Sequence, residues 1–390
     1  MRKFGRISEQ KIFGSKPLIN GSYDRSLLWV VILMTAFSLL MIYSASIVEA
    51  AHKHGNSWHY FQRQAGFILV GVLAGLTAFA LNMRRWREHS KKLLVLALAL
   101  LVLVLFVGRN INGAVRWIHI GPANIQPTEI FKLAVIIYMA DFFMRRADVL
   151  RNLKKISWVG LPLGLGIGLM MAEPDFGSTV VTAAIAVGLF FLAELPWRWF
   201  VVTVVVGLLG IAAAIVFSPY RMARVMSFTN PFDDPYGDGY QLSHSLMAVG
   251  RGEWFGVGIG SSIEKRFYLP EAHTDFIFAI IGEEFGYVGW ILLLAAYLWL
   301  VWRAFAIGTR ARELELMFGS YVAKGIGIWI GIQSFFNIGV NTGVLPTKGL
   351  TLPFMSYGGS SVVIMMVCVG LLMRVDYDNR RAQNGRSVES

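Results

Sequence analysis

Residues 269–304 read LPEAHTDFIFAIIGEEFGYVGWILLLAAYLWLVWRA. The stretch opens with polar and acidic residues and becomes an apolar block from Thr274 onward. A block of this length predicts a helix that crosses a lipid bilayer, because about 20 residues span the hydrocarbon core. Charged groups at membrane depth are costly and are rarely kept without a partner or a task. The acidic residues at the entrance and inside of this block are therefore the first candidates for function.

The composition of the whole chain agrees with a membrane protein. Of its 390 residues, 55% are hydrophobic and 15% are charged, and the mean hydropathy is +0.56. A soluble chain of this length could not bury so much apolar sequence, which also comes in blocks rather than stripes. We therefore expect an all-α polytopic membrane protein with a single integral membrane domain over residues 1–390. The single cysteine, Cys368, excludes a disulfide within the chain and a thiolate metal cluster.

The apolar blocks predict about ten transmembrane helices. They lie near residues 26–48, 63–82, 92–108, 128–144, 157–173, 176–194, 198–218, 274–304, 316–339 and 359–375. The fifth and sixth blocks are separated only by Glu173-Pro174-Asp175, which predicts a tight hairpin.

Basic residues gather in the connectors that this helix count places on one side of the membrane. The positive-inside rule assigns that side to the cytoplasm. Both termini are then cytoplasmic, with a basic tail at 1–25 and a second tail at 376–390. The net charge of +12 is thus explained by membrane topology and does not indicate nucleic acid as a partner. The remaining basic connectors are 84–92, 145–155 and 303–312.

The longest connector on the other face is 219–273, a large extracytoplasmic loop between the seventh and eighth helices. Structureless loops longer than about 15 residues are uncommon and usually functional. This one contains NPFDDPYGDGYQ at 230–241 and mixes glycine turns, aromatic residues and charges of both signs. The composition favours an ordered loop that faces a substrate.

Asp275 is the best candidate for chemistry. Pro270 disfavours helix before it, and Thr274 is a plausible N-cap, so Asp275 is expected in the first turn of the eighth helix. The helix dipole favours its ionised form and burial opposes it, and a carboxylate between these influences can act as a general base. The alternative, a carboxylate that only helps to cap the helix, is the more common role for such a residue.

Two further glutamates, Glu283 and Glu284, lie roughly 12–14 Å deeper along this helix. Lys324 enters the membrane from the cytoplasmic side in the ninth span. We expect an intramembrane ion pair between Lys324 and one of the glutamates; a proton or ion pathway is the rival interpretation.

A stripe of small residues follows Asp275 along its helix face, formed by Ala279, Gly282, Gly286 and Gly289. Small residues let a neighbouring helix approach closely. Close helix packing and a groove for a lipid tail are both compatible with this pattern.

Two loops on the outer face carry cationic and aromatic residues. In residues 112–132, NGAVRWIHIGPANIQPTEIFK, the Asn112-Gly113 turn precedes Arg116 and Trp117. Arginine there could bind phosphate and tryptophan could stack on a sugar, although interface anchoring also explains Trp117. Glu129 and Lys132 are three residues apart and can pair locally. In residues 341–361, two Leu-Pro steps and Lys348 indicate a shaped re-entrant loop.

These motifs resemble the SEDS family (shape, elongation, division and sporulation), which polymerises peptidoglycan from lipid II. The resemblance covers nearly every span. YLPEAHTDFIFA and LPTKGLTLP are similar to the cell-division branch (FtsW-like) more than to the elongation branch (RodA-like). EPDFGS departs from the family's more usual QPD[FL]GT, and QPTE from QPSE. The motifs that carry the resemblance are YSAS at 43–46, NGAVRWI, QPTE, EPDFGS, DPYGDGYQ, LPEAHTDFIFAIIGEE and LPFMSYGGSS.

The resemblance implies a glycosyltransferase of the bacterial inner membrane, enriched at the division septum, with Asp275 as its catalytic residue. Its partners would be lipid II, membrane lipid, a class B penicillin-binding transpeptidase and other division proteins. A divalent cation, Mg²⁺ or Mn²⁺, is a possible cofactor. A lipid II flippase and a non-catalytic scaffold are the competing functions. The candidate substrate-binding residues are Glu271, Arg116, Trp117, Lys132, Lys265 and Lys348.

Overall fold

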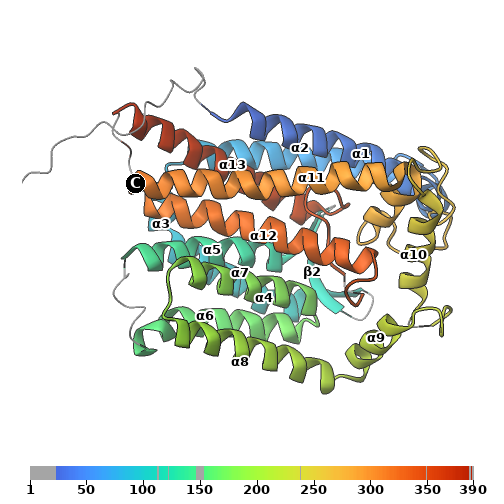
Figure 1. The fold of residues 1–390 in the computed structure, drawn as a ribbon, viewed down its shortest axis with the longest axis horizontal. Helices are drawn as coiled ribbons and strands as arrows, with labels where there is room; N and C mark the ends of the chain where they lie inside the picture. Colours follow the sequence, from blue (N-terminus) through green and yellow to red (C-terminus); the bar gives the residue numbers. More distant parts are fainter. Residues whose placement is uncertain are drawn as a thin grey trace, which may run out of the picture.

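The computed structural model describes residues 23–111, 114–121, 123–145, 153–237, 239–347, 349–385 and 388. They form a bundle of helices with one small antiparallel sheet of order β1-β2-β3 near one end (Figure 1). The helices are α1 (Arg25–His54), α2 (His59–Ala80), α3 (Met83–Glu88), α4 (Ser90–Val107), α5 (Pro127–Arg145), α6 (Leu153–Ala172), α7 (Phe176–Leu192), α8 (Trp197–Val216), α9 (Pro219–Thr229), α10 (Tyr240–Gly252), α11 (Ile277–Glu313), α12 (Met317–Asn341) and α13 (Gly359–Gln383). The strands are β1 (Arg109–Ile111), β2 (Ala114–Ile120) and β3 (Ala123–Ile125).

Each of the ten predicted spans corresponds to one long helix, which confirms the expected fold class. Within the described residues, six helices are long and apolar enough to cross a membrane: α1, α2, α4, α8, α11 and α13. The other four, α5, α6, α7 and α12, pack among them. In the part of the chain that the structure describes, the sheet is the one departure from an all-helical fold. The predicted Asn112-Gly113 turn falls outside the described residues.

Two of the basic stretches, 84–92 and 303–312, lie together at one end of the bundle, as the charge pattern predicts, whereas most of the third, 146–152, lies outside the described residues. The start of α1 and the end of α13 are also at this end, on the left of Figure 1. Arg303 of α11 links them, because it pairs with Asp24 and lies 4.0 Å from Asp376. The predicted tail at 376–390 is helical as far as Gln383, which corrects that boundary. Two i,i+4 ion pairs, Arg374–Asp378 and Arg380–Asp376, stabilise the last turns of α13.

The outer segment 219–273 is ordered, as expected, and contains α9 and α10 (Figure 1, right). The part that follows α10 supports a break in α11 at Gly286, whose φ of 66° is outside the helical region. There, the N–H groups of Val257 and Gly258 donate to the carbonyls of Glu283 and Glu284, at 2.9 and 3.1 Å. A broken helix is tolerated at membrane depth when neighbouring groups bond the freed backbone in this way.

Two residues of the small-residue stripe on α11, Gly282 and Gly286, face this same segment. A Cβ atom added to Gly252 would lie 1.9 Å from the carbonyl oxygen of Gly282, so the two backbones are in direct contact. Of the two interpretations left open, close packing is therefore the one that the fold supports.

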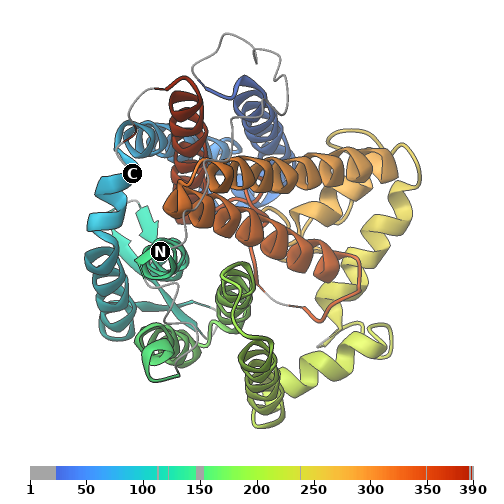
Figure 2. The same ribbon diagram turned by 60° about the vertical axis from the view of Figure 1, so that its left-hand side comes forward.

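Helix α12 lies in the interior of the bundle, where it contacts α5, α7, α11 and α13 (Figure 2). Most of its residues are buried, including the polar side chains of Gln333, Asn337 and Asn341. Buried amides need hydrogen-bond partners. Gln333 bonds both Lys132 inside the bundle and Thr351 in the loop before α13. Asn337 and Asn341 both donate to the Asp275 carbonyl, so α12 connects the bundle core to the candidate site.

Candidate active site around Asp275

Asp275 lies two residues before α11, at the same end as α9, α10 and the sheet. The prediction that Thr274 caps this helix is wrong: the N-cap residue is Phe276, which makes no side-chain cap. The Thr274 hydroxyl is instead 2.7 Å from Glu271 Oε2, to which it donates. Asn341 of α12 replaces the cap, because its Oδ1 accepts from the N–H of Ala279 at 3.1 Å. The same N–H also donates to the Phe276 carbonyl at 3.0 Å, so the first turn is held both from within and from another helix.

The main chain of residues 273–275 is held by consecutive hydrogen bonds from other elements. Tyr357 N–H donates to the His273 carbonyl at 2.9 Å, and the Ser356 hydroxyl donates to the Thr274 carbonyl at 2.6 Å. The Asp275 carbonyl accepts from two amides of α12, at 2.9 and 3.0 Å. The backbone that carries the candidate base is thus fixed at each residue.

The carboxylate of Asp275 faces a glycine in the loop between α12 and α13. A Cβ atom added to Gly349 would lie 3.0 Å from Asp275 Oδ2. Behind this loop, a Cβ on Gly177 would lie 2.9 Å from Leu350. The EPDFGS and KGLTLP motifs, far apart in sequence, therefore meet beside Asp275.

Gly349→Val is expected to lower the activity of this site about 10- to 100-fold, because the new side chain would displace a carboxylate whose position matters on the 1 Å scale. Gly250→Val is the matched control, since Gly250 is exposed on α10 and a Cβ there meets nothing within 4 Å. Rates per folded molecule, measured on labelled substrate, separate the two variants. Equal rates for both would show that the slot beside Asp275 tolerates bulk.

The surroundings of Asp275 change its proton affinity. Its side chain is partly exposed but recessed in the protein, and burial raises its pKa to about 7. The Glu271 carboxylate adds to this rise in pKa, and the Arg116 guanidinium opposes it. A pKa in this range lets the carboxyl group exchange a proton near neutral pH.

Arg116, on β2, ties the sheet to the hairpin between α6 and α7. Its Nη2 donates to the Pro174 carbonyl, and its Nη1 lies 3.9 Å from Asp175 Oδ1. Asp175 in turn caps α7 by accepting from Ser178 N–H at 3.2 Å. Trp117 is partly exposed and, as the next residue of the strand, points to the opposite face from Arg116.

Glu173 is a second buried acid in this hairpin. It is fully buried, and neither carboxyl oxygen has a hydrogen-bond partner among the described residues. Burial, followed by the charge of Asp175, raises its pKa to about 8, so the side chain is mostly protonated at neutral pH.

Lys132 forms the local pair with Glu129 that its spacing predicts, at 2.6 Å, which is confirmed. Its ammonium also donates to Gln333 at 2.9 Å and lies 4.8 Å from the ring centroid of Trp329. The Lys132 side chain is fully buried, so it cannot contact a substrate at the protein surface as predicted. Its charge acts from inside the bundle.

The predicted ion pair between Lys324 and Glu283 or Glu284 is wrong. Glu284 pairs with Lys265 at 2.7 Å, and Glu283 pairs with Arg251 at 2.6 Å. Because α11 continues to Glu313, its residue 284 lies about 43 Å along the helix from the turn to α12, whereas Lys324 is only about 10 Å from that turn. The sequence-based depth estimate failed because it ended the eighth helix at 304.

Lys265 was expected near the substrate, but it is bound inside the protein. Its ammonium lies 2.7 Å from Glu284 Oε1 and 2.9 Å from Ser44 Oγ, with 3% of the side chain exposed. Lys348, the last predicted contact, lies outside the described residues. Glu271 lies four residues before Asp275, and its carboxylate accepts a hydrogen bond from the Thr274 hydroxyl.

Sequence reasoning missed the polar stripe of α12. Gln333, Asn337 and Asn341 are spaced by four, so they share one helix face inside an apolar span. Gln333 donates to the Thr351 carbonyl at 2.9 Å, and Asn337 donates to the Leu350 carbonyl at 2.5 Å. The i,i+4 spacing of buried amides was the signal that could have identified these residues.

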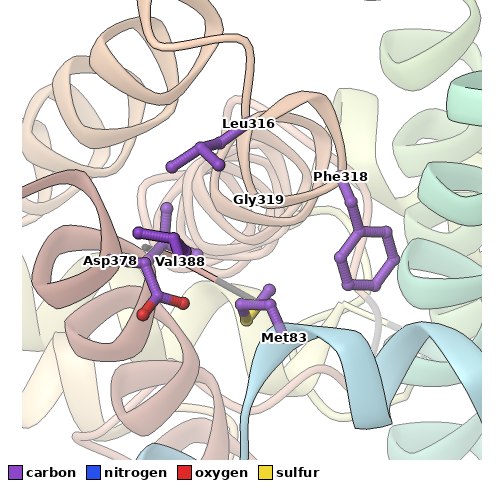
Figure 3. A pocket seen from close by; sticks show the side chains of 7 residues that line it. Met83, Leu316, Phe318, Gly319, Asp378 and Val388 are labelled. Atoms are coloured by element: carbon purple, nitrogen blue, oxygen red, sulfur yellow. The ribbon is translucent and has the colours of Figure 1, made fainter. Parts of the chain in front are cut away.

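A pocket at the opposite end of the bundle is separate from this site. Figure 3 shows it between the ends of α3, α12 and α13, with room for about one water molecule. It is lined by Met83, Leu316, Phe318, Gly319, Val375, Asp378 and Val388.

Comparisons with known proteins agree with this architecture. A family model described as "Cell cycle protein", for FtsW, RodA and SpoVE, matches residues 24–381. The chain is 52% identical to the probable peptidoglycan glycosyltransferase FtsW of Neisseria gonorrhoeae, over 96% of this chain and 89% of that protein. It is 45% identical to the protein of the same name in Aromatoleum aromaticum, over 93% and 90% of the two chains.

Two solved structures resemble the fold. One is a chain from "Structural coordination of polymerization and crosslinking by a peptidoglycan synthase complex", with a TM-score of 0.75 and 29% identity over 92% of this chain and 98% of that one. The other is the rod shape determining protein RodA of Thermus thermophilus, with a TM-score of 0.68 and 27% identity over 92% and 97%.

Proposed function

Because this chain belongs to the FtsW/RodA/SpoVE family of cell cycle proteins, we propose that it is a peptidoglycan glycosyltransferase that polymerises lipid II into septal glycan strands. The chain is more similar in sequence to the relatives named FtsW, at 52% and 45% identity, than to RodA of Thermus thermophilus, at 27%. This difference supports the cell-division branch over the RodA-like branch. Within the molecule, one observation supports this chemistry above others. Asp275 is a recessed, partly exposed carboxylate with a pKa of about 7, clamped at the outer end of the bundle.

In this proposal, Asp275 accepts the proton of the 4-hydroxyl of N-acetylglucosamine while that oxygen attacks the anomeric carbon of a lipid-linked N-acetylmuramic acid. The new glycosidic C–O bond forms as the bond to undecaprenyl pyrophosphate breaks, and the pyrophosphate leaves with the electron pair. Since pyrophosphate is already a good leaving group, a general acid is less necessary than in hydrolysis of a glycoside.

In this proposal, Arg116 and Arg224 supply the positive charge that neutralises the pyrophosphate. Arg116 and Arg224 both lower the pKa of Asp275, which places their charges within electrostatic reach of it. Arg224 also donates to the Thr347 carbonyl at 3.3 Å, next to Lys348 in sequence. Side chains of this kind suit a pyrophosphate leaving group.

A divalent cation fits this site only as part of a complex with substrate. In the described part of the chain, no three His, Cys, Asp or Glu side chains are grouped to hold a metal ion. Mg²⁺ is commonly held by one or two carboxylates together with substrate phosphates. Asp275 and Glu271 could provide those carboxylates, and the ion would neutralise pyrophosphate charge.

The proposed setting is the bacterial inner membrane, which the family and the apolar helices support. Both termini are placed in the cytoplasm on the positive-inside rule, and the protein is placed at the septum through its resemblance to FtsW. A class B penicillin-binding transpeptidase, among other division proteins, is the proposed partner. The structural relative from a synthase complex for polymerisation and crosslinking supports that choice.

The function is tested with purified protein, labelled lipid II and the cognate transpeptidase, with glycan chains resolved on a gel. We expect chains from the wild type that lengthen with time. Absence of chains, with labelled headgroups that become accessible across vesicle membranes, would favour the flippase. Inactivity in both assays, with the transpeptidase bound, would favour the scaffold.

The polymerisation rate is expected to rise as the pH increases through about 7 and to level off about one unit higher. The sign follows from the role: a general base acts in its ionised form, and burial raises the pKa of Asp275 to about 7. A kcat profile between pH 5.5 and 8.5, with substrate saturating, measures it. A flat profile would exclude a group with this pKa as the base.

A further inference from the structure

Building on the proposed function, we propose that Asn337 and Asn341 of α12 are positioning residues for the general base. Together their amides clamp Asp275 by its main-chain carbonyl and hold the start of α11 and the Gly349-Leu350 wall in register with it. Neither side chain touches the carboxylate, so their contribution to catalysis is geometric.

Asn341 connects both sides of the Asp275 turn. Its Nδ2 donates to the Asp275 carbonyl at 3.0 Å and to the Asn337 carbonyl at 2.8 Å, while its Oδ1 accepts from Ala279 N–H at 3.1 Å. Only one orientation of the amide satisfies a carbonyl on one side and an N–H on the other. The side chain is fully buried, so water cannot replace these bonds at low cost.

Asn337 connects the base to the wall beside it. Its Nδ2 donates to the Asp275 carbonyl at 2.9 Å and to the Leu350 carbonyl at 2.5 Å. Leu350 follows Gly349, whose backbone lies against Asp275 Oδ2. A single amide therefore sets the distance between the backbone of the base and the surface that its carboxylate faces.

Hydrogen bonds to the main-chain carbonyl of Asp275 restrict the direction of its side chain. This carbonyl precedes the first helical residue of α11, and in the structure its two donors are the α12 amides. Fixing this carbonyl fixes ψ of Asp275 and limits how its Cα–Cβ bond is aimed. Since a misplacement of about 1 Å in a reacting group can cost 10²-fold in rate, two hydrogen bonds here can control catalysis without touching substrate.

The test compares Asn337→Leu with Asn379→Leu in the full-length protein with its transpeptidase. Asn379 is a matched control: it is also fully buried, and its Nδ2 donates to a main-chain carbonyl, that of Ile307 in α11, at 3.0 Å. It lies at the opposite end of the bundle. Both variants lose a fully buried amide that donates to a main-chain carbonyl of another segment, so both thermal midpoints should fall.

Only Asn337→Leu is expected to lower kcat per folded molecule, by about 10- to 100-fold, with KM for lipid II within twofold of wild type. A purely structural role would lower the thermal midpoint and leave kcat unchanged. Retention of kcat within twofold by Asn337→Leu, or an equal loss in Asn379→Leu, would overturn the inference.

If Asn337→Leu does not fold, a second pair of variants tests the same inference. Asn337→Asp and Asn379→Asp keep the side-chain volume and remove the amide donors, and the same difference in kcat is expected between them. Asn337→Asp with kcat within twofold of wild type would overturn the inference. Failure of the wild type to polymerise lipid II would instead count against the proposed function, which keeps the two failures distinguishable.

Discussion

Asp275→Asn is expected to lower the rate of lipid II polymerisation by about 10²–10⁴-fold, the usual contribution of a general base. An amide keeps the size of the side chain but cannot accept a proton at neutral pH. The surrounding hydrogen bonds involve the Asp275 carbonyl of the main chain, which the substitution does not alter. We therefore expect normal folding and an unchanged or higher thermal midpoint, since a partly buried charge is removed.

The matched control is Asp233→Asn, which makes the same chemical change at an exposed position of the outer segment. Polymerisation is measured from single batches of both variants and wild type with labelled lipid II. Full activity of Asp275→Asn would exclude Asp275 as the base. An equal loss in Asp233→Asn would indicate a general effect of charge on the outer face.

Lys265→Met is expected to destabilise the protein by about 3–5 kcal/mol, because it leaves the Glu284 carboxylate buried without its cation. Glu284 is fully buried in the broken part of α11, and its other partner is the hydroxyl of Ser44, at 2.7 Å. Removal of one charge from a buried pair costs more than the pair contributes, because desolvation of the remaining charge is no longer offset.

Lys53→Met is the control, since Lys53 pairs with Glu49 at 2.6 Å but has 58% of its side chain exposed. Exposed pairs contribute about 0–1 kcal/mol. Unfolding free energies of both variants in detergent give the comparison, and Lys265→Met combined with Glu284→Met should recover most of the loss. Equal stability of the two lysine variants would contradict a dry Lys265–Glu284 pair.

The spans could be predicted because apolar length is a local property of the chain. All ten predicted blocks became helices, and the two described basic stretches, 84–92 and 303–312, lie at the same end of the bundle (Figure 1). The Glu129–Lys132 pair was also predictable, because residues three apart on a helix are neighbours wherever the helix lies. Asp275 stood out in the sequence as an acid at the mouth of a span.

Partners that come from other helices could not be predicted in this way. The cap of α11 comes from Asn341 and not from Thr274, and Glu284 takes Lys265 and not Lys324. In each case the sequence offered a wrong partner that looked suitable: Thr274 is adjacent to Asp275, and Lys324 was expected at a depth similar to that of Glu284. The choice depended on where α11 ends and on how the segment after α10 packs against its break.

The sequence by itself determined that this chain is a multi-span membrane protein with an acidic helix entrance on its outer side, because hydropathy, charge and spacing act within single segments. Only the tertiary structure decided what surrounds that acid. The slot beside Asp275 is assembled from α11, α12 and the loop before α13, and the hydrogen bonds that aim it join residues more than 60 positions apart, as Asn337 and Asn341 do. Long-range contacts of this kind follow from packing geometry, which no local pattern encodes.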